Sequence, residues 1–282
     1  MAADLQTLEE HRCFGGVQGF YEHASSVVGL PMRFGVYVPP QANERPCPVL
    51  HCLAGLTCNE QTFAIKAGAQ QHAARHGLVL VTPDTSPRGT GVVGADADWD
   101  FGTAAGFYLD ARREPYARHW RMESWLLDEV PAVLAAHFPI RHDRVGILGH
   151  SMGGHGALTL ALRHPGRFRS VSAFAPICAP TEVPWGRKAF RGYLGDDASA
   201  WSAHDAVHLI AGGARAPTLL VDQGLDDQFL ATQLRPERLE EACAAAGQPL
   251  VLRRHAGYDH GYFFIASFVA DHIAHHAAGL GD

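Results

Sequence analysis

The sequence predicts an α/β fold with a mainly parallel central sheet, helices on both faces and an antiparallel N-terminal edge. Two observations predict it. Short apolar runs alternate with helical segments through most of the 282 residues, which is typical of parallel strands connected by helices. Near the N-terminus, two strand-like stretches flank the turn residues Gly29-Leu30-Pro31, which favours an antiparallel pair. Functional side chains of such a sheet gather at the carboxyl ends of its strands.

The elements follow from apolar periodicity and from Gly and Pro at their ends. Strands are expected at residues 15–23, 32–38, 48–53, 78–82, 145–148, 171–174, 218–221 and 250–253. Helices are expected at residues 60–75, 122–137, 236–246 and 263–276, with a further helix directly after residue 151. Residues 89–116 and 175–209 are expected to be long irregular segments, and loops of such length inside a compact domain tend to be functional.

Length and composition indicate one domain that covers residues 1–282. The net charge of −6 argues against nucleic acid or an anionic membrane as a partner. No apolar stretch reaches transmembrane length, and the acidic N-terminus lacks the apolar core of a secretory signal. The six cysteines show no C-x-x-C or zinc-like spacing, so we expect reduced thiols in a cytoplasmic protein.

The segment Gly149-His150-Ser151-Met152-Gly153 fits the G-x-S-x-G nucleophile elbow. A buried strand must turn into a helix within a few residues there, which strains the backbone of the central serine, and the flanking glycines remove Cβ atoms that would collide. The Ser151 hydroxyl then lies near a helix N-terminus, which favours developing negative charge. The alternative is a tight turn with an exposed serine.

An elbow serine needs a histidine base, and the histidine needs an acid that orients it. In the α/β-hydrolase arrangement the acid follows the serine in the chain and precedes the histidine. The loop after residues 218–221 offers Asp222, Asp226 and Asp227. Asp222 abuts the strand and is the weakest candidate, but spacing does not separate Asp226 from Asp227.

The base is expected in the turn cluster 257–261, between the last strand and the last helix. His260 is our candidate. His255 remains within or near the strand, where a packing role is more common. His150 and His155 neighbour the serine in sequence, but the sharp turn points adjacent side chains apart, so we expect structural roles for both.

The oxyanion hole of this arrangement combines two backbone N–H groups. One belongs to the residue after the nucleophile, which is Met152. The other comes from the loop after the third strand, which is residues 54–57 here. Leu56 is the best candidate, because Gly55 permits an unusual turn.

A set of strings with no generic role in the fold resembles the S-formylglutathione hydrolase family, also called esterase D. They cover nearly the whole chain: CFGG (13–16), GLTC (55–58), PDTSPRG (83–89), WDFG (99–102), GHSMGGHG (149–156), SAFAPIC (172–178), PWG (184–186), DQG (222–224), DDQFL (226–230) and GYDH (257–260).

The resemblance implies a cytoplasmic serine thioesterase that hydrolyses S-formylglutathione to glutathione and formate and completes glutathione-dependent formaldehyde removal. It implies a triad of Ser151, Asp227 and His260, with Leu56 and Met152 as oxyanion donors. It implies no cofactor and no metal, and many members are homodimers. The alternative is a general short-chain carboxylesterase on the same scaffold. One departure is Ala54, where the family string has serine; only backbone groups are needed there.

Further residues are candidates for substrate contacts. Cys58 is either a thiol whose modification blocks the pocket or a small buried side chain. Large aromatic side chains either wall the acyl or glutathione site or belong to the core: Trp99, Phe101 and Trp185. Because glutathione is anionic, cations are needed near the site, and the candidates are Lys66, Arg88, Arg187 and Lys188.

Three histidines, His272, His275 and His276, share one face of the last predicted helix. Their spacing allows either a metal site or a solvated helix face.

Overall fold

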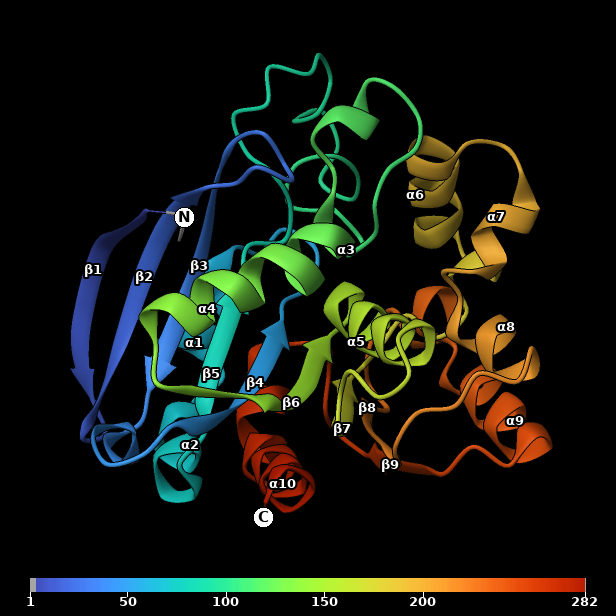
Figure 1. Cartoon of the computed structure of the whole chain (residues 1–282). Coiled ribbons are helices and arrows are strands. Elements are labelled where there is room, and N and C mark those ends of the chain that lie inside the picture. The colour runs from blue at the N-terminus through green and yellow to red at the C-terminus, as the bar shows by residue number, and fades with distance from the viewer. Residues whose placement is uncertain (1–3, 282) are drawn as a thin grey trace.

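The core of the molecule is one continuous sheet (Figure 1). The computed structural model describes residues 4–281. Within them the strands are β1 (Leu5–Cys13), β2 (Gly16–Ala24), β3 (Pro31–Val38), β4 (Cys47–Leu53), β5 (Val79–Pro83), β6 (Ile140–His150), β7 (Ser170–Phe174), β8 (Leu219–Gly224) and β9 (Leu250–His255). They lie in the order β1-β2-β3-β5-β4-β6-β7-β8-β9. The strands from β5 to β9 in this order run parallel, whereas β1, β2 and β3 form the antiparallel edge. The predicted fold class is confirmed.

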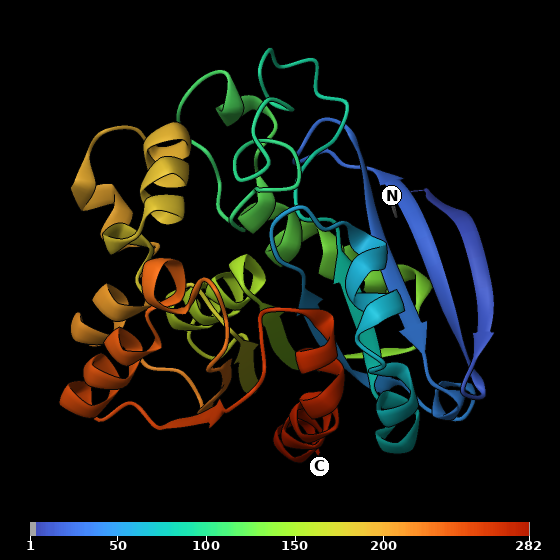
Figure 2. The same cartoon turned by 180° about the vertical axis from the view of Figure 1, so that it is seen from behind.

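Helices cover both faces of the sheet (Figures 1 and 2). Their bounds are α1 (Glu60–Lys66), α2 (Gln70–His76), α3 (Met122–Ser124), α4 (Val130–His137), α5 (Met152–Arg163), α6 (Pro184–Leu194), α7 (Ala198–Ser202), α8 (Ala206–Ala211), α9 (Pro236–Ala246) and α10 (Tyr262–Leu280). Helices α4 and α5 lie on one face, and α1, α2 and α10 lie on the other. Every residue of β7 is buried between these layers, as expected for a parallel strand covered on both faces.

Two long segments follow β5 and β7; the first of them, and helices α6 and α7 of the second, lie in the upper part of Figure 1. One is residues 89–116, which is largely irregular, as predicted. The other is residues 175–209, which was expected to be irregular but contains α6, α7 and most of α8. The expectation was wrong because the Pro and Gly residues of this stretch lie at helix ends: Pro184 starts α6 and Gly195 follows its last residue.

Other helices and strands differ from the prediction in detail. The helix expected at 60–75 is split into α1 and α2, because Gly68 between them has φ +69°. The helix expected at 122–137 contains a π-helical segment, Trp125–Glu129, between α3 and α4. Strand β1 was not predicted: seven of its nine residues are exposed, so it lacks an apolar face. No helix of residues 4–281 is long and apolar enough to cross a lipid bilayer.

Candidate active site

Ser151 occupies a strained turn between β6 and α5. Its backbone has φ 57° and ψ −117°, a conformation that residues other than glycine rarely adopt. A Cβ on Gly149 would lie 1.9 Å from the Gly153 carbonyl oxygen, and a Cβ on Gly153 would lie 2.1 Å from the Leu53 carbonyl oxygen. Both glycines are therefore required by close backbone contact. The turn leaves Ser151 at the carboxyl end of β6 and the N-terminus of α5, as the elbow motif predicts.

Asp227 and His260 form a close pair, although spacing alone left Asp226 and Asp227 open. Asp227 Oδ2 lies 2.6 Å from His260 Nδ1. The other carboxylate oxygen, Oδ1, accepts the Phe229 backbone N–H at 2.8 Å. Asp226, the competing candidate, is exposed. Since Asp227 fixes the proton on Nδ1, Nε2 of the His260 ring is the nitrogen that can accept a proton.

His150 connects the His260 loop to the strand that carries Ser151. Its Nε2 lies 3.1 Å from the His260 carbonyl oxygen, and the two rings are 4.7 Å apart. A carbonyl only accepts, so Nε2 carries the proton. Burial lowers the pKa of His150 well below its usual value, and the neighbouring His260 adds to this. His150 is therefore a neutral hydrogen-bond donor that fixes the main chain of residue 260.

The loop after β4 approaches Ser151 closely. A Cβ on Gly55 would lie 3.1 Å from the Ser151 Cβ, so this position favours glycine. The loop is anchored at two points: Tyr108 donates its hydroxyl to the Ala54 carbonyl at 2.9 Å, and the Thr57 N–H donates to Ala104 at 3.0 Å. Because residue 54 contributes only its carbonyl to this anchor, alanine serves there.

Leu56 and Met152 each present a backbone N–H close to the serine in sequence or space. No acceptor for either N–H exists among residues 4–281. Met152 is the first residue of α5, where the N–H groups have no partner within the helix. Both groups are therefore available to an oxyanion formed at Ser151.

Cys58 lies half-buried in a small polar cluster beside the site. Burial raises the pKa of its thiol, although the nearby hydroxyl groups of Thr62 and Tyr262 and the charge of Lys66 act in the opposite direction. Lys66 Nζ lies 5.8 Å from the centre of the Tyr262 ring. The Tyr262 ring in turn packs 5.6 Å from His150. Cys58 and Lys66 thus belong to the surroundings of the site.

A line of aromatic rings runs outward from His260. Phe229 packs edge-on against His260 at 5.1 Å, Trp185 lies 4.7 Å from Phe229, and Trp99 lies 5.6 Å from Trp185. Trp185 is 6% exposed, whereas Trp99 is 57% exposed. The sequence analysis named both tryptophans but missed Phe229, whose signal was its position two residues after Asp227. These rings form a wall that runs from the partly exposed His260 through the buried Trp185 to an open end at Trp99.

Other predicted contact residues are engaged elsewhere. Phe101 stacks on Tyr193 at 4.6 Å and packs against α6. Arg88 donates to both carboxylate oxygens of Asp84, at 2.6 and 2.8 Å, and to the Cys58 carbonyl at 2.9 Å. Its charge is thereby neutralised, and its role in this structure is to hold the Cys58 loop.

Arg187 and Lys188 of α6 are also engaged. The Arg187 guanidinium donates to the Thr181 carbonyl at 2.8 Å. The Lys188 ammonium forms ion pairs with Asp98, at 3.0 Å, and with Asp100. Both contacts attach α6 to neighbouring loops.

The histidines of α10 are neither solvated nor grouped as metal ligands. His272 and His276 are fully buried against β7. His276 bonds Ser170 and Ser172 at 2.6 and 2.7 Å, and His272 lies 2.9 Å from the Ser172 hydroxyl. No cluster of three metal-ligating side chains exists among residues 4–281. Periodicity places these residues on one face but does not say that this face packs on the sheet.

Comparison with known proteins gives one consistent result. The model of the Esterase family matches residues 25–275. The chain is 52% identical to an S-formylglutathione hydrolase of Mus musculus over 278 residues, which are 98% of this chain and 99% of that one. It is 50% identical to an S-formylglutathione hydrolase of Paracoccus denitrificans over 281 residues, 100% of both chains. The structure of an S-formylglutathione hydrolase from Agrobacterium tumefaciens superposes with a TM-score of 0.96 at 46% identity and covers 98% of this chain and 100% of that one.

Proposed function

The chain belongs to the S-formylglutathione hydrolase family, and we propose that it hydrolyses S-formylglutathione to glutathione and formate through Ser151, His260 and Asp227. The observation that carries the proposal is the 2.6 Å contact between Asp227 and His260, on loops at the same edge of the sheet as the Ser151 turn. This contact supports the proposal, because a serine nucleophile requires a histidine base and an acid that orients it.

In the first half of the reaction, His260 Nε2 takes the proton from the Ser151 hydroxyl as its oxygen attacks the formyl carbon. The carbonyl oxygen becomes an oxyanion that accepts the N–H groups of Leu56 and Met152, each of which is worth about 10²–10³ in rate. The carbon–sulfur bond then breaks. His260 returns its proton to the departing glutathione sulfur, and a formyl ester remains on Ser151.

In the second half, water occupies the place that glutathione has left. His260 removes a proton from this water as its oxygen attacks the formyl ester. The second oxyanion uses the same two N–H groups. Collapse releases formate, and the proton on His260 returns to Ser151. The reaction therefore requires only the substrate, one water molecule and these side chains.

The surroundings support a glutathione ester as the substrate. The wall formed by Phe229, Trp185 and Trp99 leads from the partly exposed His260 to the exposed ring of Trp99, which suits a small acyl group beside the histidine and a longer thiol along the wall. Lys66 supplies a cation near Cys58 for a glutathione carboxylate. Six unpaired cysteines suit a reducing compartment such as the cytoplasm.

We further propose two features from the family resemblance: the reaction completes glutathione-dependent formaldehyde removal, and the protein is a homodimer. Light scattering checks the second, because a monomeric mass at micromolar concentration would contradict it.

Steady-state hydrolysis of S-formylglutathione, S-lactoylglutathione and p-nitrophenyl acetate tests the reaction. We expect the highest kcat/KM with S-formylglutathione and a loss of about 10⁴–10⁶ in kcat for Ser151→Ala. The control is Ser202→Ala, on α7 and outside the site. Full turnover by Ser151→Ala would exclude this nucleophile. Equal or better turnover of the simple ester would indicate a general carboxylesterase.

A further inference from the structure

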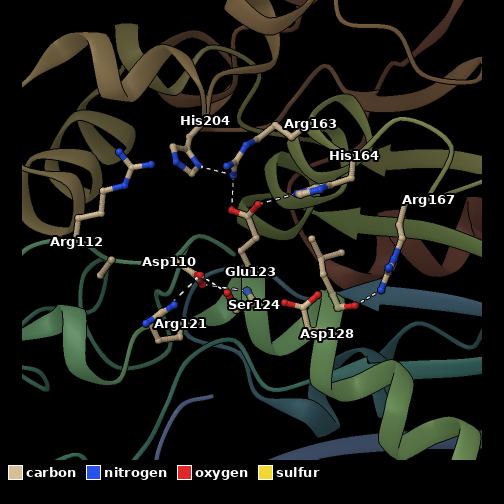
Figure 3. A pocket seen from close by; sticks show the side chains of 12 residues that line it. Asp110, Arg112, Arg121, Glu123, Ser124, Asp128, Arg163, His164, Arg167 and His204 are labelled. Carbon is tan, nitrogen blue, oxygen red and sulfur yellow. Dashed lines mark hydrogen bonds and ion pairs between the residues drawn. The ribbon is translucent and has the colours of Figure 1, made fainter. Parts of the chain in front are cut away.

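A cavity lies away from the proposed active site (Figure 3). Its volume is about 470 Å³, it is open to solvent on one side, and it is lined by the segment before and after the start of α3, by the C-terminal end of α5 and by His204. Ser151 precedes the first residue of α5 and Arg163 is its last residue. At 1.5 Å per residue these ends are about 18 Å apart, so the cavity is separate from the site of hydrolysis.

The cavity carries excess positive charge in an acidic protein. Four arginines and three carboxylates line it, whereas the whole chain has a net charge of −6. Two of the arginines are beside carboxylates that they neutralise: Arg163 pairs with Glu123, and Arg121 lies 3.4 Å from Asp110. Glu123 also pairs with His164 at 2.7 Å.

The other two arginines lie at opposite sides of the cavity. Arg167 donates to the Leu127 carbonyl and lies beside Asp128 (Figure 3). Arg112, across the cavity, has no hydrogen-bond or ion-pair partner for its guanidinium among residues 4–281. The uncompensated charge is therefore concentrated at the Arg112 side.

His204 supplies an unused donor at that same side. Arg163 Nη1 lies 3.0 Å from His204 Nδ1, and a guanidinium can only donate, so Nδ1 accepts and Nε2 carries the proton. His204 is 4% exposed, yet its buried Nε2 has no partner among the described residues. Burial lowers the pKa of His204 to about 3, with the charges of Arg163 and Arg112 adding to the effect, so the ring is neutral. Figure 3 shows it between those two guanidinium groups.

A buried N–H without an acceptor is destabilising, and a ligand oxygen removes that cost. We propose that this cavity binds a small polar molecule with a doubly charged oxyanion group, a phosphate monoester or a polycarboxylate, which accepts hydrogen bonds from His204 Nε2 and the Arg112 guanidinium. Such charge-assisted bonds are the stronger kind, and a guanidinium fork fits the planar pair of oxygens that both groups offer.

The lining also selects against larger anions. Its apolar side chains are Ala111 and Leu127, and no Phe, Tyr or Trp is among the described residues that line it. A nucleotide base would find no ring on which to stack. The compact head of a sugar phosphate or of citrate fits both the charge and the volume.

Isothermal titration calorimetry at low salt tests the proposal with glucose 6-phosphate and citrate as probes and glucose as the neutral control. We expect a dissociation constant of about 1 mM or tighter for at least one of the two anions and no heat with glucose. Binding of only one anion assigns the oxyanion class. Absence of heat with both anions, or equal binding of glucose, would overturn the proposal.

Variants locate the binding. Arg112 is exposed, so Arg112→Ala is expected to fold and to weaken binding at least about tenfold, and His204→Gln is expected to weaken it through the lost N–H. Arg12→Ala, an exposed arginine on β1, is the matched control and should bind normally. Affinity unchanged by Arg112→Ala would place the anion elsewhere and contradict the proposal.

Two further readouts separate this site from the active site. In long-range ¹H–¹⁵N spectra, the Nε2–H signal of His204 should shift when the anion binds while the ring stays neutral. The anion should also leave the KM for p-nitrophenyl acetate unchanged. An unmoved His204 signal, or competition with the ester, would contradict the proposal, and neither result depends on whether S-formylglutathione is the substrate.

Discussion

Two aspartates, one in β8 and one in the loop after it, each lie beside a histidine. The two histidines differ in whether a ring nitrogen is available to accept a proton. Asp222, in β8, receives Arg253 through two bonds of 2.6 Å and also lies 3.3 Å from His272. Asp227, just beyond β8, meets one histidine, His260, at 2.6 Å. The first carboxylate is neutralised by an arginine, and the second is not.

The histidines differ in the same way. His272 is fully buried, and its Nδ1 is already occupied by Ser172. The His260 side chain is 14% exposed, and Nε2 has no partner among residues 4–281. Burial raises the pKa of Asp222, but the neighbouring His272 and the hydrogen bonds from Arg253 outweigh burial and lower it to about 2. An Asp–His pair is therefore not enough to identify a base: one ring nitrogen must remain available beside a nucleophile.

Of the substitutions in these two Asp–His pairs, we expect the largest effect from a change of Asp227, and we expect it on turnover. Asp227→Asn removes the charge that orients His260 and stabilises its protonated form, so we expect kcat to fall by about 10⁴, as measured by steady-state hydrolysis of S-formylglutathione. The free energy of unfolding should change little. A kcat within tenfold of the wild type would show that Asp227 does not support the base.

The reciprocal change should affect stability instead. Asp222→Asn removes the buried charge that faces Arg253, which keeps its second partner Asp271, so we expect a loss of about 1–3 kcal/mol in the free energy of unfolding, measured by urea denaturation. Activity per folded molecule should stay within a few-fold of the wild type, because Asp222 does not contact His260. A loss of kcat without a loss of stability would reverse the two roles.

The buried histidines of α10 should make the stability of the fold depend on pH. Burial lowers the pKa of His276 well below its usual value, and the charges of His275 and His272 add to this. Its unfolded form therefore binds a proton near pH 6.5 while the native form does not, so stability is present above that pH and declines as pH falls below it. We expect a loss of about 2 kcal/mol from this histidine between pH 6.5 and pH 5.

Urea midpoints at several pH values measure this slope in the wild type and in His276→Gln, which cannot titrate. The variant should be less stable at neutral pH but show a shallower decline in acid. An equally steep decline in the variant would show that His276 does not titrate on unfolding.

The smallest effect is expected at the open end of the aromatic wall. Trp99→Ala removes an exposed ring, so we expect KM for S-formylglutathione to rise about threefold to tenfold, with kcat and stability nearly unchanged. The matched control is Phe101→Leu, whose ring packs on α6 and should affect stability but not KM. The opposite pattern would assign Phe101 to the substrate and Trp99 to packing.

Sequence patterns predicted those parts of the fold and site in which one short segment determines its own geometry. The Ser151 turn is an example, because its glycines, strand and helix are contiguous and each has a local steric reason. The helix Pro236–Ala246 was predicted with the bounds that the structure shows, since Pro at its first turn and Gly after its end mark both limits.

The features that could not be predicted depend on tertiary contacts between segments that are far apart in the sequence. Asp226 and Asp227 are adjacent, so spacing left both open and only the family resemblance favoured Asp227; the turn after β8 decides which of them faces His260. The buried face of α10 is set by the sheet, so His272 and His276 could not be distinguished from solvated histidines. Strand β1 is held by pairing with β2 rather than by an apolar face, and periodicity carries no signal for such an edge.

The most direct test of the proposed triad is the rate at which a fluorophosphonate labels the enzyme, with the modified residue located by peptide mass spectrometry. We predict a single label on Ser151, absent from Ser151→Ala, strongly slowed in Asp227→Asn and unchanged in folded Asp222→Asn. A label on another residue, or equal labelling rates in Asp227→Asn and the wild type, would contradict the assignment of Asp227, His260 and Ser151 as one catalytic unit.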